Sequence, residues 1–134
     1  MANKGAQLSA GQSLNVNDYL VSPGGKYFAI MQLDGNFCVY HGNGPDNQGD
    51  FVWGSVQAAG YKPKNGEYFA IMQSDGNFCQ YTGTPAKQGD FVWGTVQVGK
   101  YNPENGAYFA IMQDDSNFCV YKGSFKFGTI QNPV

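Results

Sequence analysis

The sequence predicts an all-β domain of three related units with pseudo-threefold symmetry. A nine-residue motif occurs three times, as QLDGNFCVY at 32–40, QSDGNFCQY at 73–81 and QDDSNFCVY at 113–121. Its flanking segments recur with it at a spacing of about 40 residues, and one unit of that size cannot bury its apolar face alone. The chain also has 19 glycines and 16% aromatic residues but only 13% charged ones, which is typical of a turn-rich β domain. We therefore expect a single domain over residues 1–134.

The first strand of each unit is expected at the recurring Tyr-Phe-Ala-Ile-Met-Gln, and the second at the Asn-Phe-Cys-x-Tyr half of the motif. The first run is compatible with a helix, but the Asn-Gly or Gly-Gly before it and the Asp-x-Asn after it leave too short a segment. The third strand is expected at Phe-Val-Trp-Gly-Ser/Thr-Val-Gln, with a weaker copy in the last unit. These strands fall at 27–32, 36–40 and 51–57, at 68–73, 77–81 and 91–97, and at 108–113, 117–121 and 125–131.

The motif carries a polar side chain at nearly every second position. Gln, Asp, Asn, Cys and Tyr alternate, so in a straight extended chain they project to one face. Asp-Gly-Asn is also a turn signal, and the alternative is that the five side chains cluster in one tight hairpin. Either arrangement gathers two amides, a carboxylate and a phenol around a small apolar thiol, which complements the hydroxyls and C–H groups of a sugar ring. The candidate carbohydrate-binding residues are Gln32, Asp34, Asn36, Cys38, Tyr40, Gln73, Asp75, Asn77, Cys79, Tyr81, Gln113, Asp115, Asn117, Cys119 and Tyr121.

Two of the units carry a long polar loop after the motif Tyr. The loops lie within residues 41–52 and 82–92, and the third unit lacks one. They either widen the contact with a ligand larger than one sugar or are tolerated surface insertions. Gln80 stands where the other motifs have Val39 and Val120, and we expect this edge of the second sheet to meet solvent or a partner.

Composition excludes several classes of function. The formal net charge is −2, no residue is arginine and no basic cluster exists, so we expect no nucleic-acid partner. We expect no enzymatic activity, because the motif carboxylates recur by symmetry and no nucleophile–base pair accompanies them. His41 is the single histidine and Cys-x-x-Cys is absent, which predicts no metal site and no cofactor. Asp-Gly-Asn also lacks the further acidic ligands of a calcium loop.

The cysteines and the N-terminus bear on localisation. Cys38, Cys79 and Cys119 occupy equivalent positions, and an odd set related by symmetry cannot pair throughout, so three free thiols are expected. No apolar run approaches the roughly 20 residues that span a bilayer, and residues 1–12 lack the apolar segment of a signal peptide. We expect a chain that is cytoplasmic, or secreted without a cleaved signal peptide, and that does not insert into membranes.

The sequence resembles the bulb-type, snowdrop-like mannose-binding lectins of monocots, whose signature is Gln-x-Asp-x-Asn-x-Val-x-Tyr. The likeness covers nearly the whole chain, including the lead-in at 8–32. It implies a β-prism II fold: three four-stranded antiparallel sheets around a pseudo-threefold axis, with one sugar pocket per sheet. It also implies that Trp53, Trp93 and Phe127 pack near that axis. The rival threefold fold, a β-trefoil, is disfavoured because its Gln-x-Trp signature is missing.

The resemblance also implies roles for the motif residues. Asp34 and Asn36 would bond the axial 2-hydroxyl of mannose, Gln32 the 3-hydroxyl and Tyr40 the 4-hydroxyl, and the other two motifs would do the same. Cys replaces the family's Val, which leaves a similarly apolar but smaller contact. The implied partners are mannose-containing glycans and glycoproteins, and the implied assembly is a homodimer that pairs terminal strands at 7–14 and 125–134. The alternative function is a decayed lectin fold that binds protein.

Overall fold

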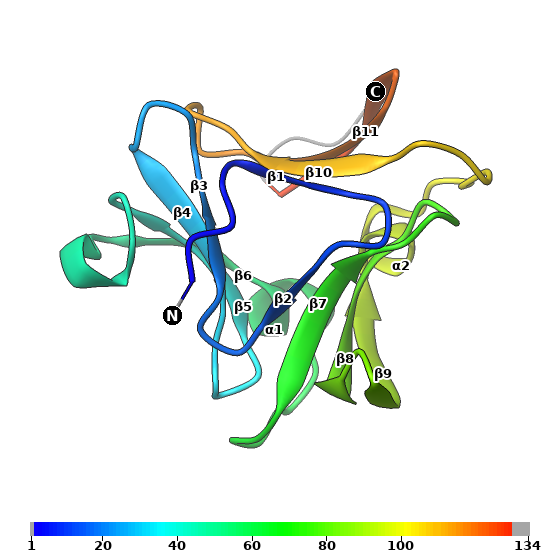
Figure 1. Cartoon of the computed structure of the whole chain (residues 1–134), viewed down its shortest axis with the longest axis horizontal. Helices are drawn as coiled ribbons and strands as arrows, with labels where there is room; N and C mark the ends of the chain where they lie inside the picture. Colours follow the sequence, from blue (N-terminus) through cyan, green and yellow to red (C-terminus); the bar gives the residue numbers. More distant parts are fainter. Residues whose placement is uncertain (1, 130–134) are drawn as a thin grey trace.

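Residues 2–129, which the computed structural model describes, form three four-stranded antiparallel sheets arranged like the sides of a triangle (Figure 1). The predicted sheet architecture is therefore confirmed. The first sheet consists of β3 (Tyr19–Val21), β4 (Tyr27–Met31), β5 (Phe37–His41) and β6 (Phe51–Gly54). The second consists of β2 (Ser13–Asn15), β7 (Tyr68–Met72), β8 (Phe78–Thr84) and β9 (Lys87–Gly94). The third consists of β1 (Gln7–Ser9), β10 (Phe109–Met112), β11 (Phe118–Lys122) and β12 (Ser124–Gly128).

The N-terminal segment gives one strand to each sheet. β1 pairs with β10, β2 with β7 and β3 with β4, so the chain visits all three sheets before the first repeat begins (Figure 1). Within the described residues, β1 and β2 are the outermost strands of their sheets, so residues 7–9 and 13–14 pair with this chain along one edge each, and the expected pairing with a second chain stays a prediction. Of the tail at 125–134, β12 likewise pairs with β11, and residues 130–134 lie outside the described residues.

Each repeat has apolar residues on both faces of its sheet. In β4, Ala29 and Met31 point into the main core, whereas Phe28 and Ile30 join Cys38 in a smaller cluster on the opposite face. The alternation in Tyr-Phe-Ala-Ile-Met produces this division, since successive side chains of a strand project to opposite faces. The motif Cys and Tyr therefore lie on the face that points away from the central axis.

The centre of the molecule is a triad of motif phenylalanines. Phe37, Phe78 and Phe118 come from the three sheets, and their ring centroids lie 5.0–5.2 Å apart. All three side chains are fully buried. Trp93 packs beside this triad and lies 5.7 Å from Trp53, which is only half-buried, while Phe127 is buried with the core.

The third strands of the first two repeats end three residues earlier than the sequence predicts. β6 and β9 end at Gly54 and Gly94, and the Ser/Thr-Val-Gln that follows begins the short helices α1 (Ser55–Ala59) and α2 (Thr95–Gly99). The Ser55 and Thr95 hydroxyls accept hydrogen bonds from the Phe37 and Phe78 amides, which fixes the chain where it turns from strand to helix. Among the described residues, no helix is long and apolar enough to cross a lipid bilayer.

Gln80 does not meet solvent or a partner, contrary to the expectation for this edge of the second sheet. Its side chain is fully buried. Its Nε2 donates to the Gly35 carbonyl at 2.8 Å, and its Oε1 accepts from the Trp93 indole at 2.8 Å. A buried amide is tolerated when its donors and acceptors have partners, and here those partners lie on two different sheets.

Candidate functional site

Each motif makes a tight hairpin rather than one straight strand. The first runs from the end of β4 at Met31 to the start of β5 at Phe37, and the Gly35 amide donates to the Gln32 carbonyl. Gly35 and Gly76 have positive φ values of 86° and 91°, and Ser116 adopts 73° at the equivalent position. Glycine adopts this left-handed conformation without strain, which explains the Asp-Gly-Asn sequence. Of the two arrangements open from the sequence, the hairpin is the correct one.

The motif Gln and Tyr meet directly on the outer face of each sheet. In the first motif, Gln32 Nε2 donates to the Tyr40 hydroxyl at 2.8 Å and the Cys38 thiol donates to Gln32 Oε1 at 3.0 Å. In the second and third motifs, the Tyr hydroxyl donates to the Gln Oε1 at 2.6 Å, and the Gln Nε2 donates to the motif Asp. Every motif thus holds a preassembled polar group of Gln and Tyr.

The motif Asp is exposed, and a backbone amide of the same hairpin holds its carboxylate in place. In all three motifs Oδ1 accepts from the backbone amide of the Asn two residues later, at 3.0 Å. This is the local bond of an Asx turn, and it fixes the direction of the carboxylate. Asp34, Asp75 and Asp115 thereby present charged acceptors to solvent beside the Gln side chain.

The motif Asn points partly into the protein. Asn36 Oδ1 accepts from the Val56 amide at the start of α1, and its Nδ2 donates to Gln57 Oε1 at 3.2 Å. Asn77 makes the same contacts with Val96 and Gln97. Asn117 is buried and accepts from the Thr129 hydroxyl. The Asn therefore connects the hairpin to the end of the third strand.

Residues that the sequence analysis did not single out support these hairpins. The hydroxyls of Tyr61 and Tyr101 donate to the carbonyls of Gly35 and Gly76 at 2.8 and 2.7 Å. Each hydroxyl also bonds the Ser55 or Thr95 hydroxyl of the preceding repeat. The two tyrosines recur at the same place in the repeat, as do Gln57 and Gln97, and this recurrence was the available signal.

The motif Tyr lies between two phenylalanines on the outer face. Tyr40 stacks on Phe28 with ring centroids 5.5 Å apart, and the edge of Phe51 meets it at 5.9 Å. The other repeats have Phe69, Tyr81 and Phe91, and Phe109, Tyr121 and Phe125, in the same order. These cross-strand aromatic contacts restrict the Tyr ring and so position its hydroxyl.

The three thiols lie beneath the polar groups and are free. Cys38, Cys79 and Cys119 are 0–1% exposed. Burial raises the pKa of each thiol to about 12, because the thiolate would lose its hydration. The uncharged thiol therefore serves as a small apolar contact under the site.

We expect the native protein to resist thiol-specific reagents and to expose three reactive thiols only on unfolding. At pH 8 a group with a pKa near 12 is almost wholly protonated, and the thiolate is the reacting form. Thiol counting with and without denaturant, on freshly purified protein, measures both values. Fewer than three thiols in denaturant, or rapid reaction without it, would contradict the prediction.

The two long loops differ in their relation to the motifs. Pro45 and Gln48 of the first loop line a hollow of about 380 Å³ together with Gln32 and Asp34. The hollow at the second motif, of about 560 Å³, is lined by Ile71 and the motif residues Gln73, Ser74 and Asp75 together with Ala10 and Gly11, and by no residue of the second loop. Of the two long loops, therefore, only the first lines the hollow at its own motif.

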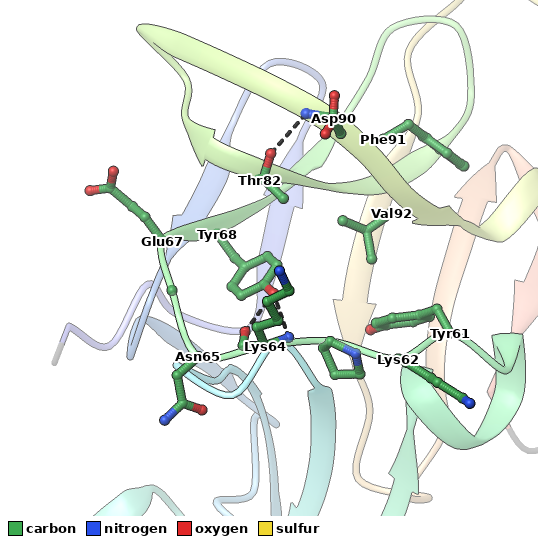
Figure 2. Close-up of a pocket in the computed structure, with 12 residues that line it drawn as sticks. Tyr61, Lys62, Lys64, Asn65, Glu67, Tyr68, Thr82, Asp90, Phe91 and Val92 are labelled. Atoms are coloured by element: carbon green, nitrogen blue, oxygen red, sulfur yellow. Dashed lines mark hydrogen bonds between the residues drawn. The ribbon is translucent and has the colours of Figure 1, made fainter.

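The second loop borders a different hollow, of about 530 Å³, between residues 61–68 and the β8–β9 hairpin (Figure 2). In Figure 2 the side chains of Tyr61, Tyr68 and Val92 face this space. It opens where the pseudosymmetry is broken. His41 packs 4.8 Å from the Tyr27 ring, and Lys122 lies over the Tyr108 ring, whereas the smaller Thr82 stands at the same position beside Tyr68. No motif residue lines this hollow.

Within residues 2–129, no group of three or more His, Cys, Asp or Glu side chains is arranged to hold a metal ion. The motif Asp side chains lie in three separate hairpins, and each is bonded to an amide hydrogen. The groups that converge on each site are amides, a carboxylate and a phenol, which are donors and acceptors for neutral hydroxyl groups.

Comparison with solved structures places this architecture among lectins. A monomeric monocot mannose-binding lectin from Gastrodia elata has 26% identity and a TM-score of 0.68, and the match covers 96% of this chain and 99% of that one. A lectin from Marasmius oreades has 25% identity and a TM-score of 0.70, covering 96% and 93% of the two chains. Snowdrop (Galanthus nivalis) agglutinin, in complex with methyl-α-D-mannoside, has 24% identity and a TM-score of 0.63, covering 89% and 91%. No protein-family model and no curated protein sequence matches the chain.

The chain therefore has the β-prism II fold, as the resemblance implied. Its structural neighbours include mannose-binding lectins of monocots. Lectins bind carbohydrate without transforming it, which agrees with the expectation that this chain is not an enzyme.

Proposed function

We propose that the protein is a lectin that binds α-mannose in glycans and glycoproteins without a metal ion. The observation that carries the proposal is the threefold repetition of one polar group, in which a Gln and a Tyr are bonded beside an exposed Asp. These side chains lie on the outer faces of the sheets, away from the core. Packing alone therefore gives no reason for the same three polar residues to recur together.

The proposed contacts follow the resemblance and fit the chemistry of the site. Asp34 and Asn36 are assigned to the axial 2-hydroxyl of mannose, Gln32 to the 3-hydroxyl and Tyr40 to the 4-hydroxyl. A carboxylate makes the stronger kind of hydrogen bond to a hydroxyl. Asn36 Nδ2 has two hydrogens, one of which goes to Gln57, so the amide has a second hydrogen for a sugar. A sugar without the axial hydroxyl would leave these groups without their partner, which disfavours it.

Calorimetry with methyl α-mannoside in the presence of a chelator tests this function. We expect binding at three sites with a dissociation constant in the roughly millimolar range, about −4 kcal/mol per site, because each site is open and contacts one ring. Methyl α-galactoside is the matched control, and we expect no competition from it.

Two outcomes would overturn parts of the proposal. Binding that returns only when calcium is added would contradict metal independence. No binding of any mannoside would contradict the lectin assignment and favour the alternative, a lectin fold that binds protein. The half-exposed Phe51 and Phe91, 49% and 48% accessible, would then be candidate contacts for that partner.

The homodimer stays a proposal, and the outer edges of β1 and β2, which pair within the chain on one side only, are its candidate interface. The sites do not require it. Each sheet of one chain carries its own motif, and the outer faces of the three sheets point in different directions (Figure 1). A single chain can therefore present three sites.

A further inference from the structure

The first long loop is folded against the outer face of the first sheet. The Gly42 amide donates to the Lys26 carbonyl at 2.8 Å, and the Gly49 amide donates to the His41 carbonyl at 2.8 Å. Between them, Pro45–Asn47 form a single 3-10 turn. Gly44 lies so close to the Tyr19 ring that a Cβ there would be 3.2 Å from it. The loop is thus fixed at both ends and packed at its middle.

This fold brings amide side chains around the first motif. Gln48 of the loop, Asn17 from the β2–β3 turn and Asn65 from the next repeat line the same hollow as Gln32 and Asp34. Gln48, Asn17 and Asn65 are all exposed. Amides both donate and accept, which is the complement of a hydroxyl-bearing ring.

The second motif lacks these surrounding amides, although its loop ends in nearly the same four residues. Residues 47–50 read Asn-Gln-Gly-Asp and residues 87–90 read Lys-Gln-Gly-Asp, so Gln48 corresponds to Gln88. Gln88, however, lies in β9 and pairs with Gly83 as part of a regular hairpin. The hollow at the second motif has Ala10 and Gly11 on the side where the first has Asn17, and no residue of its loop.

We propose that the first motif is an extended site that takes two α-linked sugars, the second ring being bound by the amides of Gln48, Asn65 and Asn17. The second motif takes a single terminal sugar. This assignment rests on the proposed function, since the first ring occupies the Gln32, Asp34 and Tyr40 group. It gives the first and second of the three pseudosymmetric sites different ligand preferences within one chain.

The test uses a protein in which only the first site remains, made by the substitutions Asp75→Ala and Asp115→Ala. Methyl α-mannoside and the α-1,2-, α-1,3- and α-1,6-linked dimannosides are titrated separately by calorimetry. We expect at least one dimannoside to bind more tightly than the monosaccharide, by roughly two- to tenfold for each added hydrogen bond. Gln48→Ala should remove part of this gain and leave the affinity for methyl α-mannoside unchanged. Gln88→Ala is the matched control and should change neither affinity.

The outcomes separate the inference from the function on which it rests. If methyl α-mannoside binds and every dimannoside binds equally well, the extended site is wrong and the lectin assignment stands. An equal loss in the Gln48→Ala and Gln88→Ala proteins would also overturn the extended site. If methyl α-mannoside itself does not bind to the one-site protein or to the parent protein, both proposals fail.

Discussion

Replacing Phe78 by alanine is expected to lower the free energy of unfolding by about 3–5 kcal/mol. Phe78 is fully buried, and its ring lies 5.2 Å from Phe37 and 5.0 Å from Phe118 at the point where the three sheets meet. Removing the ring loses the favourable free energy of its transfer out of water, and it leaves a cavity that the three sheets border. Two rigid neighbours from other sheets cannot both move to fill it. Urea unfolding followed by tryptophan fluorescence measures the change.

Phe91→Ala is the matched control, because it deletes the same ring from a site that is 48% exposed. Its cost should be well below that of Phe78→Ala. Equal losses in the two proteins would contradict a core centred on the phenylalanine triad. The triad also explains why the motif Phe recurs with the polar residues: it places each hairpin at a fixed distance from the common axis, and the site residues follow on the outer face.

The sequence was sufficient to predict the fold class because its patterns are local and repeated. The alternation in Tyr-Phe-Ala-Ile-Met and in Asn-Phe-Cys-x-Tyr indicates strands, and three copies indicate the pseudosymmetry. The segment before the first repeat has no copy of itself. β1, β2 and β3 have three residues each, and β1 and β2 pair with β10 and β7, which are distant in sequence. Three residues are too few to show the apolar–polar alternation that identifies a strand.

The details that differ from prediction depend on contacts between residues that are far apart in the sequence. Ser55 begins a helix rather than continuing a strand because Asn36 accepts the Val56 amide hydrogen, a bond across 20 residues. Gln80 is buried because the Gly35 carbonyl, 45 residues away, accepts from its amide. A local sequence pattern assigns polar residues to the surface, because it does not show hydrogen-bond partners that are distant in the sequence. Gln48 and Gln88 make the same point, since the two loops end in the same Gln-Gly-Asp and yet Gln48 follows a 3-10 turn whereas Gln88 lies in a strand.

The candidate site was predicted more completely than its surroundings. Gln32, Asp34 and Tyr40 meet at one hairpin because the turn signal lies inside the motif, so sequence spacing alone brings them together. Asn36 was expected to face a ligand, and the structure gives it a second role in holding α1 to the hairpin. The hydroxyl contacts assigned to each residue stay a prediction that the calorimetric titration tests.

Removing two of the three motif carboxylates is expected to weaken binding to a surface coated with a mannose-rich glycoprotein by roughly 10²–10⁴-fold. Asp75→Ala and Asp115→Ala each delete an exposed acceptor on a separate sheet, so the fold and the first site should be unaffected. Calorimetry with methyl α-mannoside should then give one site per chain in place of three, with the same affinity at that site. Asp90→Ala, an exposed aspartate outside the motifs, is the matched control and should change neither value.

The large loss follows from the weakness of each site rather than from any contact between them. A site with a millimolar dissociation constant releases its sugar quickly, but a second site on the same chain rebinds a neighbouring branch at a high effective concentration. The three sites lie on the outer faces of different sheets, so they reach separate branches or separate chains rather than one terminal sugar. Light scattering on the same samples gives the number of chains per particle, which separates the contribution of one chain from that of a homodimer. If the protein with one remaining site holds the glycoprotein surface as tightly as the parent does, a single site carries the binding and the other two motifs serve another purpose.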